Sequence, residues 1–324
     1  MPTSSLRRLL IAAVIGLVPA LAFTQTFPSG PVTIVVPYAA GGLTDGLARA
    51  LSARLAERWK QPVIVENRAG AGTVIGNAVV ARAPADGHTL LMTSFGFVTS
   101  QFLVPDLPYK PQSLAPLAML ADAPSVLFVH PSVPANNIPE LVRYMKSQKT
   151  PMTFASSGNG SSPHIAAELF ASMAGVEITH VPYRGNGPAI TDLLGGQVQA
   201  LFDSMATLAH VKTGKLKTLG VASAQQAPQA PELTPIAQSG VAELAGFTSG
   251  SWFGILLPAA TPTEIQTRLA ADIRAVLETP SMRDAILKGG VQPVLSSQAE
   301  FTDYLRSETT KWGRIIKDKN IRAQ

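Results

Sequence analysis

Glycine, threonine and serine residues gather where short β-rich runs give way to helical patterns. The first such place is PYAAGGLTD at 37–45, which follows the apolar run 32–36 and precedes leucines at helical spacing. Glycines let backbone amides approach a ligand, and a helix N-terminus adds unpaired N–H groups with a partial positive charge. Such a turn can bind a carboxylate without a cationic side chain. The alternative is that the glycines only form a tight turn and that Thr44 or Asp45 only caps the helix.

Three further turns have a similar composition. They are NRAGAGT at 67–73, SSGNGSSPH at 156–164 and RGNGP at 184–188. Ligands of open parallel sheets lie beyond the carboxyl ends of the strands, where such turns occur. No nucleophile paired with a base is evident among them, so they predict a binding site.

Enzymes are the alternative. Ser161, Ser162 and His164 share one turn, as in an exported serine-type hydrolase, but the sequence lacks a G-x-S-x-G elbow and a third group to orient the base. The segment 70–78 departs from the dinucleotide-binding fingerprint because its last gap is three residues. His164 and Glu168 could share a helix face, but a metal site needs a third ligand. We therefore predict no enzyme activity, no cofactor and no metal.

The elements that must position these turns alternate between strands and helices. Helical spacing is clearest at Leu47, Leu51 and Leu55, and again from Ile165 to Met173. This alternation predicts an α/β fold with a largely parallel sheet. A helix over 263–278 and a capping box from Ser297 to Glu300, opening a helix to about 317, are expected near the C-terminus. The expected strands are 32–36, 63–66, 89–93, 152–155, 178–181, 200–203 and 217–221.

Two proline-rich stretches, 130–139 and 227–235, interrupt the alternation. A mature chain of this length exceeds one ordinary core. We expect a discontinuous first lobe formed by 27–128 plus 248–324, and a second lobe formed by 129–247. A chain that crosses twice between lobes forms a hinge, and a hinge lets a cleft close on a ligand.

The N-terminus has the pattern of a secretory signal peptide at residues 1–22. Arg7 and Arg8 precede an apolar run, and small residues predict cleavage after Ala22. A membrane anchor is the alternative, but the apolar stretch is shorter than the roughly 20 residues of a spanning helix. The chain has no cysteine, which excludes a lipidated cysteine, disulfides and thiolate zinc sites. We expect a free, monomeric protein in the periplasm.

The charge of the mature chain suits a small anion. Removal of residues 1–22 takes away two arginines and no acidic residue, so the formal net charge falls from +5 to +3. The basic clusters at 212–217 and 311–319 lack an arginine-rich stripe with aromatic residues. No nucleic-acid partner is expected.

Longer motifs make the sequence similar to one family. VPYAAGGLTD, VENRAGAGT, ADGHTLL, FASSGNGSSPHIAAELF, VPYRGNGPAITDLLGGQVQALFD and GFTSGSWFGILLPAATP occur in this order over nearly all of the mature chain. The chain resembles the substrate-binding receptors of tripartite tricarboxylate transporters, the Bug-type family. The resemblance implies a two-lobed periplasmic-binding-protein-like fold with a hinge and an interlobe ligand cleft. It also implies a membrane permease of the tripartite tricarboxylate type as partner, or a role in sensing.

The resemblance implies a small carboxylate or an amino acid as ligand. A trianion would demand more cationic side chains than Arg184 and Arg68, so we expect a mono- or dicarboxylate. Asp45 stands where it could face a ligand ammonium, and Arg184 where it could face a second carboxylate. Asn159 and Gly160 are expected to bring backbone amides to the ligand. Trp252 and Phe253 are expected in the core near the hinge. The implied ligand-binding residues are Tyr38, Gly41, Gly42, Thr44, Asp45, Ser94, Ser157, Asn159, Gly160, Ser161, Arg184 and Asp203.

Overall fold

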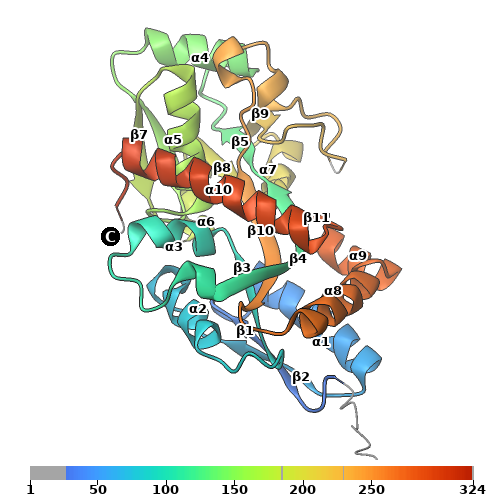
Figure 1. The fold of residues 1–324 in the computed structure, drawn as a ribbon. Helices are drawn as coiled ribbons and strands as arrows, with labels where there is room; N and C mark the ends of the chain where they lie inside the picture. The colour runs from blue at the N-terminus through green and yellow to red at the C-terminus, as the bar shows by residue number, and fades with distance from the viewer. Residues whose placement is uncertain (1–26, 184, 229, 323–324) are drawn as a thin grey trace, which may run out of the picture.

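The computed structural model describes residues 27–183, 185–228 and 230–322. They form two lobes, each built on its own β-sheet and stacked one above the other (Figure 1). The expected signal peptide lies outside the described residues. Within the described ranges, no helix combines the length and apolar character needed to cross a membrane.

The first sheet has six strands in the order β11-β4-β10-β3-β1-β2. β1 pairs in parallel with β2 and β3, whereas β10 runs antiparallel to β3 and β4. The strand bounds are β1 Val32–Val36, β2 Val63–Asn67, β3 Thr89–Ser94, β4 Leu114–Pro124, β10 Gly250–Pro258 and β11 Gln292–Pro293. The helices of this part are α1 Leu43–Trp59, α2 Val74–Ala81, α3 Gly96–Leu103, α8 Thr263–Leu277, α9 Pro280–Lys288 and α10 Gln298–Asp318.

The second sheet has five strands in the order β7-β6-β8-β5-β9. β6 pairs in parallel with β7 and β8, and β5 runs antiparallel to β8 and β9. The strand bounds are β5 Val126–Val129, β6 Met152–Ser156, β7 Ile178–Pro182, β8 Ala200–Asp203 and β9 Lys217–Val221. The helices are α4 Ile138–Ser147, α5 Ser162–Ala174, α6 Asn186–Leu194 and α7 Leu208–Lys212, with short 3-10 turns η3 Met205–Thr207 and η5 Ala242–Leu244.

All seven expected strands are present, but the prediction of a largely parallel sheet is wrong. Both sheets are mixed, because β4, β5 and β10 pair only in antiparallel fashion. These three strands are not among those expected from the sequence. β4 and β5 are mostly buried on both faces and do not alternate between apolar and polar residues.

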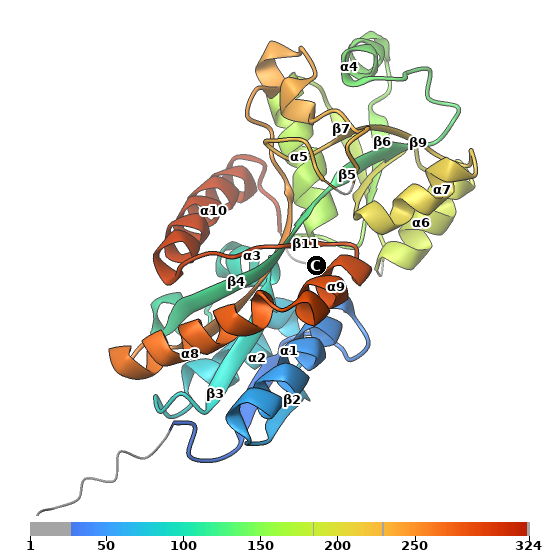
Figure 2. The same cartoon turned by 90° about the vertical axis from the view of Figure 1, so that its right-hand side faces the viewer.

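Alternation along the strands divides the core. Ile34 packs into a cluster with α1, α8 and α9, while its neighbour Val35 faces a different cluster. That second cluster also contains Leu127 and Phe154 from the second sheet and Trp312 from α10. One apolar core is therefore shared by both lobes, and α10 lies along their junction (Figure 2).

The chain crosses between the sheets twice. β4 ends at Pro124 and β5 begins at Val126, so the first crossing lies at Ser125, earlier than the expected boundary after 128. The return crossing leads into β10 at Gly250. The two crossings lie together, because the Ser125 N–H donates to the Ser249 carbonyl at 2.9 Å. This backbone hydrogen bond positions Ser125 and Ser249 beside each other at the junction.

Candidate functional site

A cavity of about 1150 Å³ opens between the two lobes. It lies where β1, β3, β6 and β8 end and their following turns begin, as expected for ligands of α/β sheets. Nine of the predicted residues line it: Tyr38, Gly42, Thr44, Ser94, Ser157, Asn159, Gly160, Ser161 and Asp203. Residues from turns more than 100 positions apart are thus brought to one cleft.

Four helices begin at this cavity. Gly42 precedes α1, Phe95 precedes α3, Ser161 precedes α5 and Gly185 precedes α6, and all four residues line the cavity. The first N–H groups of a helix have no partner within it, and they carry a partial positive charge. The cleft therefore concentrates hydrogen-bond donors suited to an anion.

The side chains of the cleft are mostly uncharged. Among the described residues that line it, Asp203 is the one carboxylate, and no lysine, arginine or histidine is present. Arg184 lies outside the described residues. Arg68 does not line the cavity; its guanidinium pairs with Glu66.

Gly41 and Asp45 do not line the cavity. The Asp45 carboxylate is buried and accepts hydrogen bonds from the Gly41 N–H at 2.9 Å, Arg49 Nε at 2.9 Å and Asn67 Nδ2 at 2.9 Å. The pKa of Asp45 is lowered to about 2, mainly by the hydrogen bond from Arg49. In this structure Asp45 holds the first turn in shape, and its oxygens already have protein partners.

The second-lobe turn, residues 156–161, differs from expectation at Gly160. Its N–H donates to His164 Nδ1 at 3.0 Å, so this amide is not directed to a ligand. Gly160 instead lets the lobes approach each other, because a Cβ atom there would overlap Leu103 of α3. Its φ of +72° also favours glycine.

Asp203 lines the cleft with both oxygens bonded. Oδ1 accepts from Asn186 Nδ2 at 2.5 Å, and Oδ2 accepts from Thr207 Oγ1 at 2.6 Å. Burial raises the pKa of the Asp203 carboxyl. Asp203 thereby ties the start of α6 to η3. Sequence reasoning missed Asn186, although it lies in the glycine-rich turn that was singled out.

The rest of the wall is apolar or hydroxyl-bearing. Burial raises the pKa of Tyr38 to about 12, so its phenol stays neutral. Phe253 is buried and lines the cavity, whereas Trp252 is fully buried and packs on Phe301 with ring centroids 5.6 Å apart. Ser125, at the first crossing, also lines the cleft, and no local motif indicates it.

The geometry of the serines does not form a hydrolase site. Ser161 Oγ donates to the Gly158 carbonyl at 2.6 Å, and Ser162 Oγ donates to the Gly250 carbonyl at 3.1 Å. His164 Nδ1 accepts the Gly160 N–H, and the hydroxyls of Ser161 and Ser162 are bonded to backbone carbonyls and not to His164. In the described part of the chain, no group of three or more potential ligands is placed to hold a metal ion.

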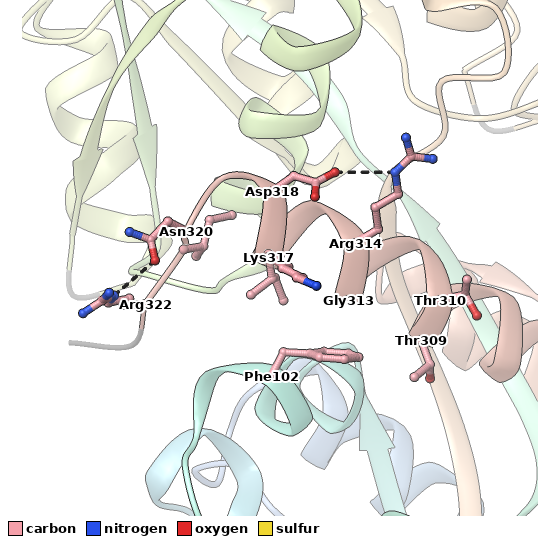
Figure 3. A pocket seen from close by; sticks show the side chains of 11 residues that line it. Phe102, Thr309, Thr310, Gly313, Arg314, Lys317, Asp318, Asn320 and Arg322 are labelled. Atoms are coloured by element: carbon pink, nitrogen blue, oxygen red, sulfur yellow. Dashed lines mark hydrogen bonds and ion pairs between the residues drawn. The ribbon is translucent and has the colours of Figure 1, made fainter.

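A second cavity of about 920 Å³ lies on the outer side of α3, below the end of α10 (Figure 3). Phe102 lies across from Gly313, where an added Cβ would be 2.5 Å from the ring. Arg314 pairs with Asp318 at 3.5 Å at the solvent-exposed edge of the cavity. α3 separates this cavity from the interlobe cleft, because Thr99 and Leu103 of the same helix line the cleft.

Comparison with known proteins gives a consistent result. The family model "Tripartite tricarboxylate transporter family receptor" matches residues 47–321. The chain is 36% identical over 301 residues to a "UPF0065 protein in tcbD-tcbE intergenic region" of Pseudomonas sp. strain P51, covering 92% of this chain and 89% of that protein.

Solved structures are similar over the same length. The structure described as "R. palustris Rpa4515 with adipate" has a TM-score of 0.77 and 33% identity, and the match covers 92% of this chain and 100% of that one. The structure of MatC from Rhodopseudomonas palustris with bound malate has a TM-score of 0.73 and 29% identity, and the match covers 90% of this chain and 100% of that one.

Proposed function

Because this chain belongs to the tripartite tricarboxylate transporter receptor family, we propose that it is a periplasmic receptor that binds a small carboxylate in the cleft between its lobes. The observation on which this proposal rests is the convergence of four helix N-termini on a cavity lined by both lobes. Partial charges at these ends favour one carboxylate group.

The lining also limits the ligand's total charge. A trianion would place several charges against a wall whose described residues include no cationic side chain. Buried charges without partners cost several kcal/mol each. Apolar side chains such as Leu43, Phe95 and Phe253 supply surface for a hydrocarbon chain. We therefore propose a mono- or dicarboxylate with an apolar body, and we keep as part of this proposal the sequence-based expectation that Arg184 faces a second carboxylate.

Relatives support this class of ligand. The two similar structures are named with adipate and with malate, both of which are dicarboxylates. An amino acid is the second candidate. Its ammonium group would have to approach Asp203, because Asp45 does not line the cavity.

We propose uptake through a tripartite tricarboxylate-type permease, or sensing, without catalysis. The N-terminal pattern at 1–22 supports export to the periplasm. The serine geometry of the cleft supports binding without turnover, since neither Ser161 nor Ser162 bonds to a base.

A thermal-shift screen tests the ligand class. Adipate, malate, aspartate, citrate and aromatic acids are compared, and hits are titrated by calorimetry. A ligand at one hundred times its dissociation constant should add about 2.7 kcal/mol of stability. We expect mono- or dicarboxylates to bind. Micromolar binding of citrate with none of the smaller acids would overturn the proposed ligand class, and hydrolysis of an ester probe would overturn the non-catalytic role.

A further inference from the structure

Two histidines lie stacked beneath the second-lobe turn. His164 in the first turn of α5 and His180 in β7 have ring centroids 3.6 Å apart and planes only 5° from parallel. His164 is buried, with 6% of its surface exposed. Neither imidazole lines the interlobe cleft.

Each imidazole is bonded to one end of the turn 156–161. His164 Nδ1 accepts the Gly160 N–H at 3.0 Å, and His180 Nε2 is 2.6 Å from Ser156 Oγ. Ser156 Oγ in turn accepts the Gly158 N–H at 3.1 Å. The pair therefore fixes both ends of a turn whose Ser157, Asn159 and Ser161 face the cleft.

We propose that His164 and His180 are positioning residues for the second-lobe ligand turn, and that they act as a neutral, stacked pair. This proposal rests on the proposed carboxylate-binding role of that turn. His164 must be the Nε2–H tautomer, because Nδ1 accepts a backbone proton. Protonation of Nδ1 with the proton on Nε2 retained would remove the bond from Gly160 and place a positive charge against the neighbouring ring.

Few charged groups lie around the pair. Glu168 on α5 is closest, with Oε1 3.9 Å from His164 Nε2, and burial raises the pKa of Glu168. Lys319, just after the end of α10, lowers the pKa of Glu168 through its positive charge. Asp203 on β8 is bonded to Asn186 and Thr207, and Glu243 on η5 is exposed. Strands β6 and β10 carry no charged side chain.

Burial lowers the pKa of both histidines, that of His164 to about 3 and that of His180 to about 4. The neighbouring ring lowers the pKa of His164 further. The stacked pair thus stays neutral over the pH range of ordinary growth.

Nuclear magnetic resonance of the ligand-free protein tests the positioning role directly. His164→Leu and His164→Asn are a matched pair of similar shape, and asparagine retains an oxygen close to the position of Nδ1. We expect the Gly160 amide signal to move in His164→Leu and to stay near its wild-type position in His164→Asn. His210→Asn, on α7, is the control and should leave that signal unchanged. The ring-nitrogen signals of His164 should show the Nε2–H tautomer at pH 7.5.

Two outcomes would overturn the proposal. One is a proton on Nδ1 of His164 at pH 7.5, and the other is an identical Gly160 signal in the leucine and asparagine variants. A titration with adipate adds a functional measurement, in which His164→Leu should bind at least tenfold more weakly than His164→Asn. If the wild type does not bind adipate, the ligand proposal is affected and the amide measurement still decides the role of the pair.

Discussion

Gly160 shows how one residue can serve the cleft without donating its amide to a ligand. Its N–H donates to His164 Nδ1, and the absence of a side chain leaves room for Leu103 of the other lobe. The residue therefore determines how closely α5 and α3 approach each other.

We expect Gly160→Ala to weaken binding of the carboxylate found in the screen. Alanine at φ +72° costs about 1 kcal/mol, and its Cβ would overlap Leu103. Calorimetry should show reduced affinity that Leu103→Ala partly restores in the double variant. Gly187→Ala, in α6 with no atom within 4 Å of the added Cβ, is the control. Equal affinity in Gly160→Ala and the wild type would contradict a role in lobe approach.

Asp45 links Gly41 of the first turn, 37–45, to Arg49 of α1 and to Asn67 at the end of β2. We expect Asp45→Asn to lower the free energy of unfolding by about 1–3 kcal/mol, because the bonds to Gly41, Arg49 and Asn67 are weakened or lost. Urea unfolding measures the change. Asp303→Asn, whose ion pair with Arg306 is exposed, should change stability by less than about 1 kcal/mol. Equal effects of the two substitutions would show that the Asp45 bonds do not stabilise the turn.

The stacked histidines predict an acid-sensitive fold. Their pKa values in the folded state are lowered from 6.5 to about 3 and about 4, so the unfolded chain binds more protons at mildly acidic pH. The stability they contribute is present above pH 6.5 and is lost as the pH falls toward 4. The melting temperature should fall over this range, and less steeply in His164→Asn. Parallel curves for both proteins would contradict the contribution of His164.

At the scale of elements, α10 joins the crossings to the shared core. The capping box expected from Ser297 and Glu300 is present at its start. Further along, Glu308 bonds to Trp312 Nε1 at 2.5 Å and to Lys311 Nζ at 3.3 Å. Lys311 Nζ also donates to the carbonyl of Thr248, just before the return crossing, at 2.8 Å. α10 is thus bonded to the segment about which the lobes would move.

We expect Glu308→Leu to reduce the free energy of unfolding by about 3 kcal/mol, because Lys311 and Trp312 Nε1 would lose their buried partner. Urea denaturation of the full chain measures this loss. Glu278→Leu, which removes an exposed pair with Arg274 on α8, is the control and should cost less than about 1 kcal/mol. A loss at Glu308 no larger than at Glu278 would rule out a stabilising role for this cluster.

At the scale of the molecule, two sheets contribute to one cleft and two adjacent crossings connect them. Such a connection allows rigid-body closure of one lobe onto the other. We expect the radius of gyration, measured by small-angle scattering, to decrease when the carboxylate from the screen is added. A non-binding acid from the same screen is the control. An unchanged radius at saturating ligand would contradict closure.

The sequence by itself determined the family, seven of the strands and the location of the turns. The resemblance from the ordered motifs is confirmed by the family match over 47–321. Strands β1, β8 and β9 have the predicted bounds, and the Ser297 capping box forms as expected. These features depend on neighbouring residues, so local pattern is sufficient to indicate them.

Only the tertiary structure decided what each polar group bonds to. The Gly160 amide bonds to His164, and His180, from another strand, completes the stacked pair. Asp45 meets Asn67, 22 residues away, and therefore lies outside the cavity lining. The long strands β4 and β10 escaped prediction because burial in a mixed sheet removes their alternation. Even the Gly160 to His164 bond, four residues apart, depends on the turn conformation, and the other partners and strand neighbours depend on contacts between distant segments, which the spacing of residues along one chain does not encode.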